Sequence, residues 1–391
     1  MQQKRLILAL ILSSAILFLW TFFYPAPTPQ NQNNQANSAV SESPQPTASA
    51  TPSPDTANQQ SVTSVGPSTA APQRMLTIRT PLYEAKFDSR GAEPVSWIIK
   101  KNKRTDVQIY SSASTREKRQ SLELISPAGL SRQPREVPLQ LRTGDSALDA
   151  ALSSSTYKIE GIDAADGDAE LNLSSGQRQQ VTFVLENANG VQVRKTVEFD
   201  ADRYDTDLVV LVKRGTETVP VKLSIGPSIG DQGVSYHTFY SVAPEAIAFV
   251  NGNIERHTAA AINGNSKSPD HHSLNGPIDW AGVGDTYFAM VAVPYRRTEG
   301  LEYRTVAYEH KANGTPEKRF LISGLIPIAS DGSPTVIYAG PKDHYLLTEA
   351  SGGISRKVER PGPIDLDGLI DYGFLAWLSR PLAIPILQAI T

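Results

Sequence analysis

The sequence predicts a mainly β protein whose folded part is a large antiparallel β-sandwich, and three observations lead to this prediction. Apolar and polar residues alternate with a period of two in several segments, which is typical of strands with one buried and one wet face. Turn-forming groups such as Asn251-Gly252 and Asn275-Gly276-Pro277 punctuate these segments. No amphipathic helical pattern of good length lies between them. Strands that follow one another through short turns favour an antiparallel sandwich.

The alternation is clearest in residues 83–88, 191–199 and 219–225, which read YEAKFD, VQVRKTVEF and VPVKLSI. Two other segments, 208–212 and 286–293 (LVVLV and TYFAMVAV), lack it, and we expect these strands to be covered on both faces. The β domain is therefore predicted to span residues 75–362.

The amino-terminal segment predicts a membrane anchor. After Lys4 and Arg5, an uncharged run from Leu6 to Tyr24 would extend about 28 Å as a helix, close to the ~30 Å hydrocarbon core. Trp20 and Tyr24 stand at its far end, where aromatic rings prefer the interface. The alternative is a cleaved signal peptide, which has a shorter apolar region and small residues at its cleavage site. We expect an uncleaved helix with a cytoplasmic amino terminus and everything after Tyr24 exported.

Residues 25–74 have a different composition, rich in Pro, Ser, Thr, Gln, Asn and Ala, with almost no large apolar side chain. Such a segment cannot bury enough surface to offset its loss of conformational entropy. We expect a disordered tether between the anchor and the β domain, with recognition by a proline-binding partner as a minor alternative.

The last segment, residues 363–391, grows steadily more apolar. Asp365 or Asp367 could cap a helix that continues through Leu378, and its apolar residues are not confined to one face. The residues after Arg380 are too few to span a bilayer. The sequence therefore predicts an interfacial helix, on which the aromatic and basic residues that meet the membrane surface are Tyr372, Phe374, Trp377 and Arg380.

Composition excludes several classes of function. The net charge is −3 and the pI is about 6.1, so no global basic field indicates a nucleic-acid partner. The chain has no cysteine, which excludes disulfides, thiol nucleophiles and cysteine-zinc sites. Phosphate-binding, dinucleotide-binding and zinc-protease motifs are missing from the sequence.

Two motifs have both a catalytic and a structural interpretation. Residues 226–230 (GPSIG) match the nucleophile-elbow pattern, but that elbow needs a helix after it, and we interpret the motif as a turn. Adjacent His271 and His272 would point to opposite faces of an extended chain, so we expect solvated loop residues rather than metal ligands. Residue chemistry alone therefore predicts no catalytic, cofactor or metal site.

The order of these parts, together with several strings, resembles the YidC/Oxa/Alb family of membrane protein insertases. The opening 24 residues resemble the family's uncleaved first transmembrane helix. The other strings that carry the resemblance, in chain order, are LTIRTPLYEAKFDSRGAEPVSWIIKKN (76–102), VRKTVEFDADRYDTDLVVLV (193–212), IDWAGVGDTYFAMVAVP (278–294), VIYAGPKDHYLL (336–347) and DYGFLAWLSRPL (371–382).

This resemblance implies a non-enzymatic, cofactor-free function at the bacterial inner membrane, with a supersandwich-like periplasmic domain. It implies nascent membrane proteins, the lipid bilayer and the Sec translocon (SecYEG and SecDF) as partners, and a chaperone role in the insertion and folding of hydrophobic segments. In the family, five further transmembrane helices form a hydrophilic groove with an important arginine. We expect that core to be missing from this chain, and Arg380 is not that arginine.

A second hypothesis follows from the likeness of the family's domain to sugar mutarotases. It is a membrane-anchored carbohydrate-binding or mutarotase-like protein, with His237, Glu245 and His271 in the roles of paired histidines and a glutamate. The spacing of these residues gives it little support.

Overall fold

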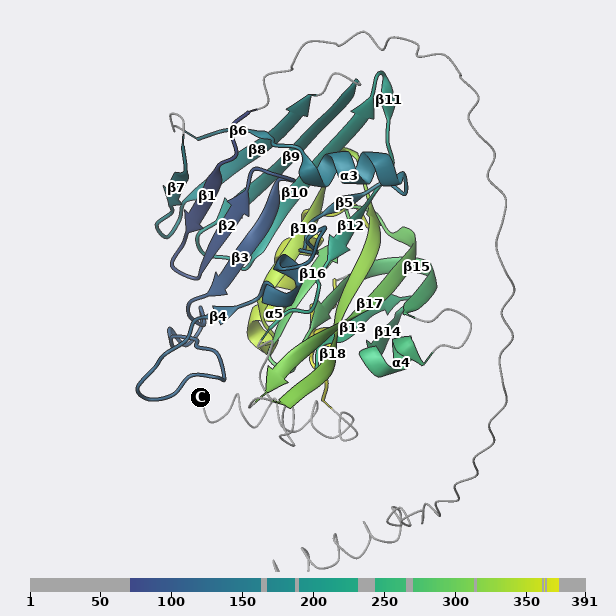
Figure 1. Cartoon of the computed structure of the whole chain (residues 1–391). Coiled ribbons are helices and arrows are strands. Elements are labelled where there is room, and N and C mark those ends of the chain that lie inside the picture. Colours follow the sequence, from purple (N-terminus) through teal and green to yellow (C-terminus); the bar gives the residue numbers. More distant parts are fainter. Residues whose placement is uncertain are drawn as a thin grey trace, which may run out of the picture. The chain divides into compact units, whose positions relative to one another are not determined.

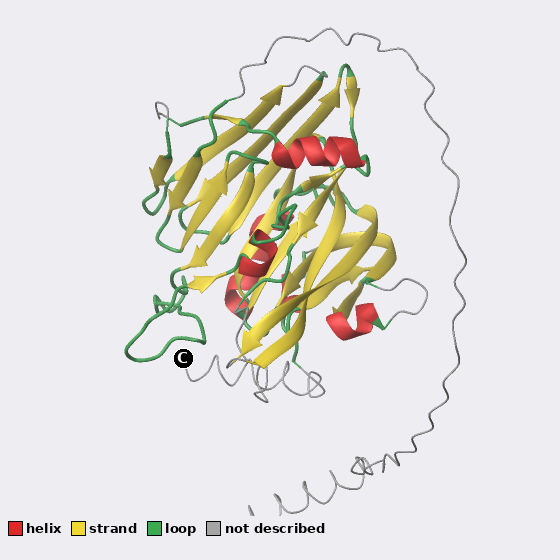
Figure 2. Ribbon diagram, in the orientation of Figure 1, coloured by secondary structure: helices red, strands yellow, loops and turns green. Residues whose placement is uncertain are grey.

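The computed structural model describes residues 71–162, 167–186, 190–230, 243–264, 270–312, 315–360, 362 and 364–372. These residues belong to one compact unit, Val65–Thr391. Strands make up most of their regular structure (Figure 2), so the predicted mainly β fold with large antiparallel sheets is confirmed. The predicted anchor, residues 6–24, and nearly all of the predicted tether lie outside the described residues.

The first sheet has five strands in the order β4-β3-β2-β1-β7. All its pairs are antiparallel except that of β1 with β7, which is parallel. The strands are β1 (Met75–Arg79), β2 (Tyr83–Asp88), β3 (Glu93–Ile99), β4 (Leu122–Glu123) and β7 (Ala169–Asn172).

The second sheet has fourteen strands, and its main path runs β5-β12-β18-β17-β15-β16-β19-β10-β9-β8-β6. Its strands are β5 (Leu141–Arg142), β6 (Lys158–Glu160), β8 (Arg178–Glu186), β9 (Val191–Asp200), β10 (Asp205–Arg214), β11 (Glu217–Thr218), β12 (Val221–Ile225), β13 (Glu245–Val250), β14 (Asn253–Thr258), β15 (His271–Gly284), β16 (Phe288–Val293), β17 (Thr298–Ala312), β18 (Thr315–Ile328) and β19 (Asp331–Pro341).

Aromatic side chains join the first sheet to β8 and β9 of the second. Phe87 on β2 stacks on Phe183 and meets Phe199 edge to face, with ring centroids 5.7 Å apart in both pairs. Trp97 on β3 stacks on Tyr83 and is fully buried. Figure 1 shows the purple and blue strands β1–β3 over the teal strands β8–β10. This face-to-face packing is the predicted β-sandwich.

Strand β15 belongs to two layers of the second sheet. Its first half pairs with β17, whereas its second half pairs with β13 and β16. Buried Tyr303 of β17 links the layers, because its hydroxyl donates to the carbonyls of Ile247 on β13 (2.8 Å) and Gly282 on β15 (3.1 Å). Both parts of the long sheet contribute to one continuous hydrophobic core with the first sheet.

The helices were not anticipated from the sequence. Helix α5 begins after Asp343, whose carboxylate accepts hydrogen bonds from the amides of Tyr345 and Leu346. Its buried residues recur on one face, but Gly352 and Gly353 weaken the helical signal. The described helices are α2 (Pro127–Leu130), α3 (Ser146–Ser154), α4 (Ala259–Asn263), α5 (His344–Ser355) and the 3-10 turn η1 (Leu366–Leu369).

Several local predictions can be compared with the structure. Of the segment 286–293, predicted to be covered on both faces, residues 288–293 form the fully buried strand β16, whereas Thr286 and Tyr287 lie outside the strand and Tyr287 is exposed. Asn251-Gly252 forms the β13–β14 turn with both φ angles positive. The prediction for 208–212 was wrong, because every second residue there is only half-buried. His271 and His272 lie in strand β15 rather than in a loop, since β15 pairs with β17 from its first residue.

A buried lysine connects the two sheets. Lys195 on β9 is 1% exposed, and its ammonium donates to the carbonyls of Ala92 (2.6 Å) and Leu139 (2.7 Å). Burial lowers the pKa of Lys195 to about 8, and the nearby carboxylate of Glu93 opposes this shift. Burial likewise raises the pKa of Glu93, against the effect of Arg135. The ammonium of Lys195, on the second sheet, therefore binds both the turn before β3 of the first sheet and the loop before β5.

Candidate functional site

The carboxyl-terminal end of the described chain is fixed to helix α5. Asp367 of η1 lies 2.6 Å from the imidazole of His344 and accepts a hydrogen bond from the hydroxyl of Tyr372 at 3.2 Å. The guanidinium of Arg256 on β14 donates to the carbonyls of Gly368 (2.8 Å) and Leu369 (3.0 Å). The chain therefore reaches Tyr372 from a defined position, directly before the apolar sequence 373–391.

The helix predicted to start near Asp365 begins only as a 3-10 turn. Asp365 makes no side-chain capping hydrogen bond, and Ile370 has an extended backbone with φ −80° and ψ 125°. Two serines of α5 instead accept hydrogen bonds from the amides of this segment, Ser351 from Leu366 and Ser355 from Ile364. The helix predicted from Asp365 or Asp367 through Leu378 was therefore wrong up to Tyr372, because contacts with α5 hold residues 364–372 in another conformation. Its remainder, 373–378, lies outside the described residues.

Of the predicted site residues, Tyr372 is described and its hydroxyl contacts Asp367. The remaining ones lie outside the described residues: Lys4, Arg5, Trp20, Tyr24, Phe374, Trp377 and Arg380.

Mutation of Asp367 to alanine is expected to loosen residues 364–372. The change removes the acceptor shared by His344 and Tyr372, at a cost of about 1–2 kcal/mol. Hydrogen exchange of the amides in this segment should accelerate roughly tenfold or more. Asp365, exposed and without a capping bond, is the matched control. Equal exchange rates in D367A and D365A would contradict the role of this carboxylate.

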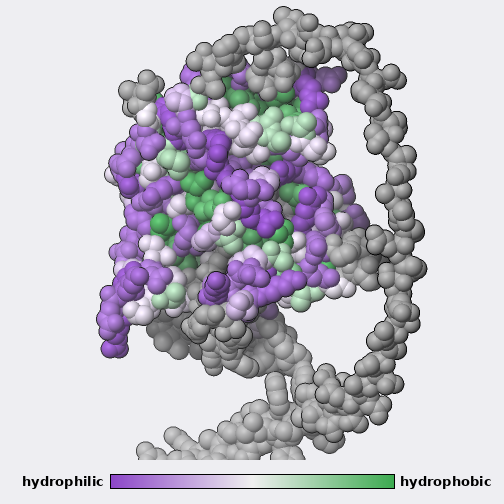
Figure 3. Space-filling view, viewed as in Figure 1, coloured by the Kyte–Doolittle hydropathy of each residue, from purple (hydrophilic) through white to green (hydrophobic). Residues whose placement is uncertain are grey.

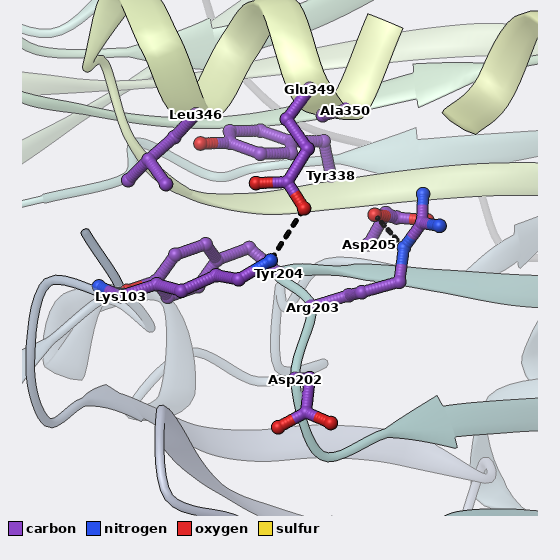
Figure 4. A pocket seen from close by; sticks show the side chains of 9 residues that line it. All are labelled: Lys103, Asp202, Arg203, Tyr204, Asp205, Tyr338, Leu346, Glu349 and Ala350. Carbon is purple, nitrogen blue, oxygen red and sulfur yellow. Dashed lines mark hydrogen bonds and ion pairs between the residues drawn. The ribbon is translucent and has the colours of Figure 1, made fainter. Parts of the chain in front are cut away.

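Helix α5 is attached to the sheet across a small polar hollow of about 250 Å³ (Figure 4). Figure 4 shows Glu349 pointing down from α5 to the ammonium of Lys103, and Arg203 lying against Asp205 at 2.8 Å. The hydroxyl of Tyr204 accepts a hydrogen bond from the amide of Lys103 at 3.1 Å. These polar groups bind one another across the hollow, so we assign it an anchoring role for α5.

A larger open cleft, with about 1560 Å³ of empty volume, lies over β17, β18 and the loop before β5. Its lining carries both signs of charge, from the cations Arg142, Arg304 and Lys318 and the acidic residues Glu136, Asp149 and Asp270. Such a lining can bind a polar ligand but does not select one chemical class. Within the described ranges, no group of three or more histidine or acidic side chains gathers as a metal site.

The residues proposed for a mutarotase-like site do not come together. His271 is the first residue of β15, whereas Glu245 pairs with Gly284 at the opposite end of that strand. Glu245 forms an ion pair with Arg256 instead, and His237 lies outside the described residues. The described pair does not form the active site of the second hypothesis.

His272 and Ser228, which the sequence offered as possible site residues, contact other parts of the fold. The imidazole of His272 packs against that of His257, with centroids 4.0 Å apart, and burial followed by the proximity of His272 lowers the pKa of His257. Ser228 is 2% exposed, and its hydroxyl accepts a hydrogen bond from the amide of Ile322 at 3.0 Å. That serine fixes a turn to β18, in keeping with the structural interpretation of GPSIG.

No helix within the described ranges combines the length and apolar character needed to cross a bilayer.

Comparisons with known proteins agree on one family. A family profile for the YidC periplasmic domain matches residues 75–385. Proteins named membrane protein insertase YidC from Syntrophus aciditrophicus and Nitratidesulfovibrio vulgaris (strain DP4) are each 24% identical to this chain. The first comparison covers 97% of this chain and 64% of the relative, and the second 98% and 62%. The chain thus spans less than two thirds of these relatives.

Solved structures give weaker likenesses. A galactose mutarotase related enzyme from Lactobacillus acidophilus has 9% identity and a TM-score of 0.33, covering 68% of this chain and 97% of that one. A 4-alpha-glucanotransferase from Thermococcus litoralis has 10% identity and a TM-score of 0.30, covering 70% and 40%. Such low scores carry no functional argument. Because the family profile extends over most of the sequence, the chain belongs to the YidC family of membrane protein insertases.

Proposed function

We propose that this chain is the anchor and periplasmic part of an insertase and chaperone that helps hydrophobic segments insert, fold and assemble in the bacterial inner membrane. Its partners are nascent membrane proteins and the lipid bilayer, with the Sec translocon (SecYEG and SecDF) engaged for part of its substrates. The function is non-enzymatic and needs no cofactor. Unpaired polar groups are costly inside hydrocarbon. Insertion therefore depends on polar groups of the insertase that bind the polar residues flanking a hydrophobic segment of the nascent chain.

One observation carries this proposal. Within a domain of this family, the segment that ends at Tyr372 is held by α5 and β14 directly before nineteen largely apolar residues. A defined position at the start of an apolar segment suits a domain that lies on a membrane surface. The proposed order is a transmembrane helix (6–24), a tether (25–74), the β domain (75–362) and a carboxyl-terminal segment (363–391) whose apolar part, 373–391, forms the interfacial helix, with Lys4 and Arg5 cytoplasmic.

The topology can be tested with single cysteines, because the chain has none of its own. In spheroplasts, a membrane-impermeant thiol reagent is expected to label S43C in the tether but to label Q2C only after lysis. Extraction of the chain without detergent, or labelling of Q2C in intact spheroplasts, would contradict the proposed anchor.

A second test asks whether the β domain is needed for membrane insertion. In the Syntrophus aciditrophicus relative, deletion of the segment that aligns with 75–360 is expected to leave insertion of a test membrane protein intact. The β domain cannot supply a polar groove inside hydrocarbon. Insertion is measured by protease protection in cells depleted of their own insertase, with the complete relative as control. Loss of all insertion would show that the β domain takes part in the insertion step.

A further inference from the structure

The loop that joins β3 to β4, residues 100–121, has a charge opposite to that of the rest of the chain. It contains seven lysine and arginine side chains against two acidic ones, a net charge of +5. Since the whole chain carries −3, the remaining residues carry −8. This local excess of positive charge attracts anions that the remainder of the protein repels.

Loop 100–121 has a defined structure. The hydroxyl of Tyr204, in the β9–β10 turn, donates to the carbonyl of Lys101, while isolated bridges join Lys101 to Gln108 and Tyr110 to Ser121. Figure 1 shows this dark-blue loop projecting at the lower left, and Figure 3 shows a strongly hydrophilic projection at the same place. The base of the loop is thus fixed to the domain, and its outer part projects from it.

The cations at the outer turn of the loop have no acidic partner in the described part of the chain. Arg116 and Lys118 are exposed and form no ion pair with any described residue, and the guanidinium of Arg119 lies over the ring of Tyr110 at 4.9 Å. By contrast, Lys103 and Arg104, nearer the base, are paired with Glu349 and Asp343. The outer turn can therefore offer its cations to a ligand outside the domain.

Exposed apolar side chains gather around this loop. Four large hydrophobic residues are exposed among those described: Val107 (61%), Tyr110 (43%), Tyr287 (58%) and Tyr345 (38%). The first two are on the loop, and the guanidinium of Arg104 lies 4.8 Å from the ring centroid of Tyr345.

Tyr287 belongs to the same end of the domain. Its carbonyl accepts a hydrogen bond from the amide of Lys342 at 2.7 Å, next to the capping residue Asp343 of α5. The exposed apolar residues therefore all lie around loop 100–121 and the start of α5.

The chain leaves the domain beside this surface. His344, next to Tyr345, contacts Asp367, and Asp367 contacts Tyr372. The described chain therefore ends near Tyr345 and the basic loop, directly before the apolar sequence 373–391. Surfaces that combine tyrosines with lysine and arginine suit the interface of a bilayer with anionic lipids.

We propose that loop 100–121, together with Tyr287 and Tyr345, is a bilayer-contact surface that binds the phosphate headgroups of anionic phospholipids. Arg116, Lys118 and Arg119 supply the cations, while Val107 and the tyrosines enter the interfacial region. This inference rests on the proposed membrane location of the chain and adds to it a second, lipid-selective attachment.

The test places one fluorescent probe on the complete chain, reconstituted in vesicles. S114C puts the probe on the loop, and T216C puts it on the β10–β11 turn at the far end of the domain (Figure 1). Headgroup-spin-labelled lipid is expected to quench the probe at residue 114 at least about threefold more strongly with about 30% phosphatidylglycerol than in pure phosphatidylcholine. The probe at residue 216 should not respond, and added salt should reduce the effect at residue 114.

Charge reversal at the outer turn should abolish the lipid dependence. Arg116→Glu with Lys118→Glu is expected to reduce quenching at residue 114 to the phosphatidylcholine level. Lys158→Glu with Lys213→Glu changes the net charge equally at sites away from the loop, and should leave quenching unchanged.

The remaining outcomes are distinct. Equal quenching in both lipids, or quenching at residue 216 as well, would overturn the proposed headgroup site. A response at residue 114 only after other membrane proteins are added would assign the surface to a protein partner and also overturn it. A chain that fails to float with the vesicles at all would instead contradict the proposed membrane anchoring.

Discussion

Replacement of Lys195 by alanine is expected to lower the free energy of unfolding by about 3–5 kcal/mol. The ammonium is fully enclosed and donates to the carbonyls of Ala92 and Leu139, so its removal leaves two buried acceptors unpaired and opens a cavity. Glu93 would also lose a nearby cation. Urea denaturation of the detergent-solubilised chain, followed by tryptophan fluorescence, measures the change.

Two further variants make this test specific. Lys195→Met keeps most of the volume and removes the charge, so it should cost less than alanine. Lys213→Ala, on a neighbouring strand and without an ion pair among the described residues, should change stability by less than about 0.5 kcal/mol. A K195A protein as stable as K213A would show that the sheets do not depend on this ammonium.

Replacement of Gly353 by alanine is expected to destabilise the docking of helix α5 by about 2 kcal/mol. A Cβ at this position would overlap the guanidinium of Arg203, which is paired with Asp205. Relief of this overlap requires a shift of the helix or a turn of the Arg203 side chain, and the side chain can turn only by disturbing its ion pair with Asp205. Hydrogen exchange across α5 and the denaturation midpoint should both report the loss.

Gly352, the neighbouring residue, provides a control for which the change in stability should have the opposite sign. A Cβ at Gly352 would meet no atom within 4 Å. Gly352→Ala should therefore stabilise the helix by up to about 1 kcal/mol, since alanine favours the helical backbone. If both variants shift stability in the same direction, close packing at Gly353 does not determine how α5 docks.

Strand periodicity predicted the fold class well because burial on one face leaves a direct mark in the sequence. It also contained the signal for the buried lysine. In VQVRKTVEF, Lys195 falls in phase with the buried Val193 and Val197, and a cation at such a position indicates an enclosed, paired charge. Helix α5 was missed because its paired glycines and short length hide the helical period.

The candidate site was harder to predict, since its residues come from distant parts of the chain. Contacts between Lys103 and Glu349, or between Arg256 and the carbonyl of Gly368, have no local signature in the sequence. Asn275-Gly276-Pro277 shows the same limit. We expected a turn there, but the register shifts within β15 and the strand continues, because pairing with β17 and β13 outweighs local turn propensity.

The sharing of β15 between two layers has a mechanical consequence. The β17 part and the β13 part of the sheet are both hydrogen-bonded to β15, which is one continuous strand. One part can therefore slide past the other only if its hydrogen bonds to β15 break. Arg256 joins Gly368 to β14, and β14 pairs with β13, which pairs with β15. A force applied at Tyr372 is therefore passed through Arg256 and β14 to the strand that both parts of the sheet share.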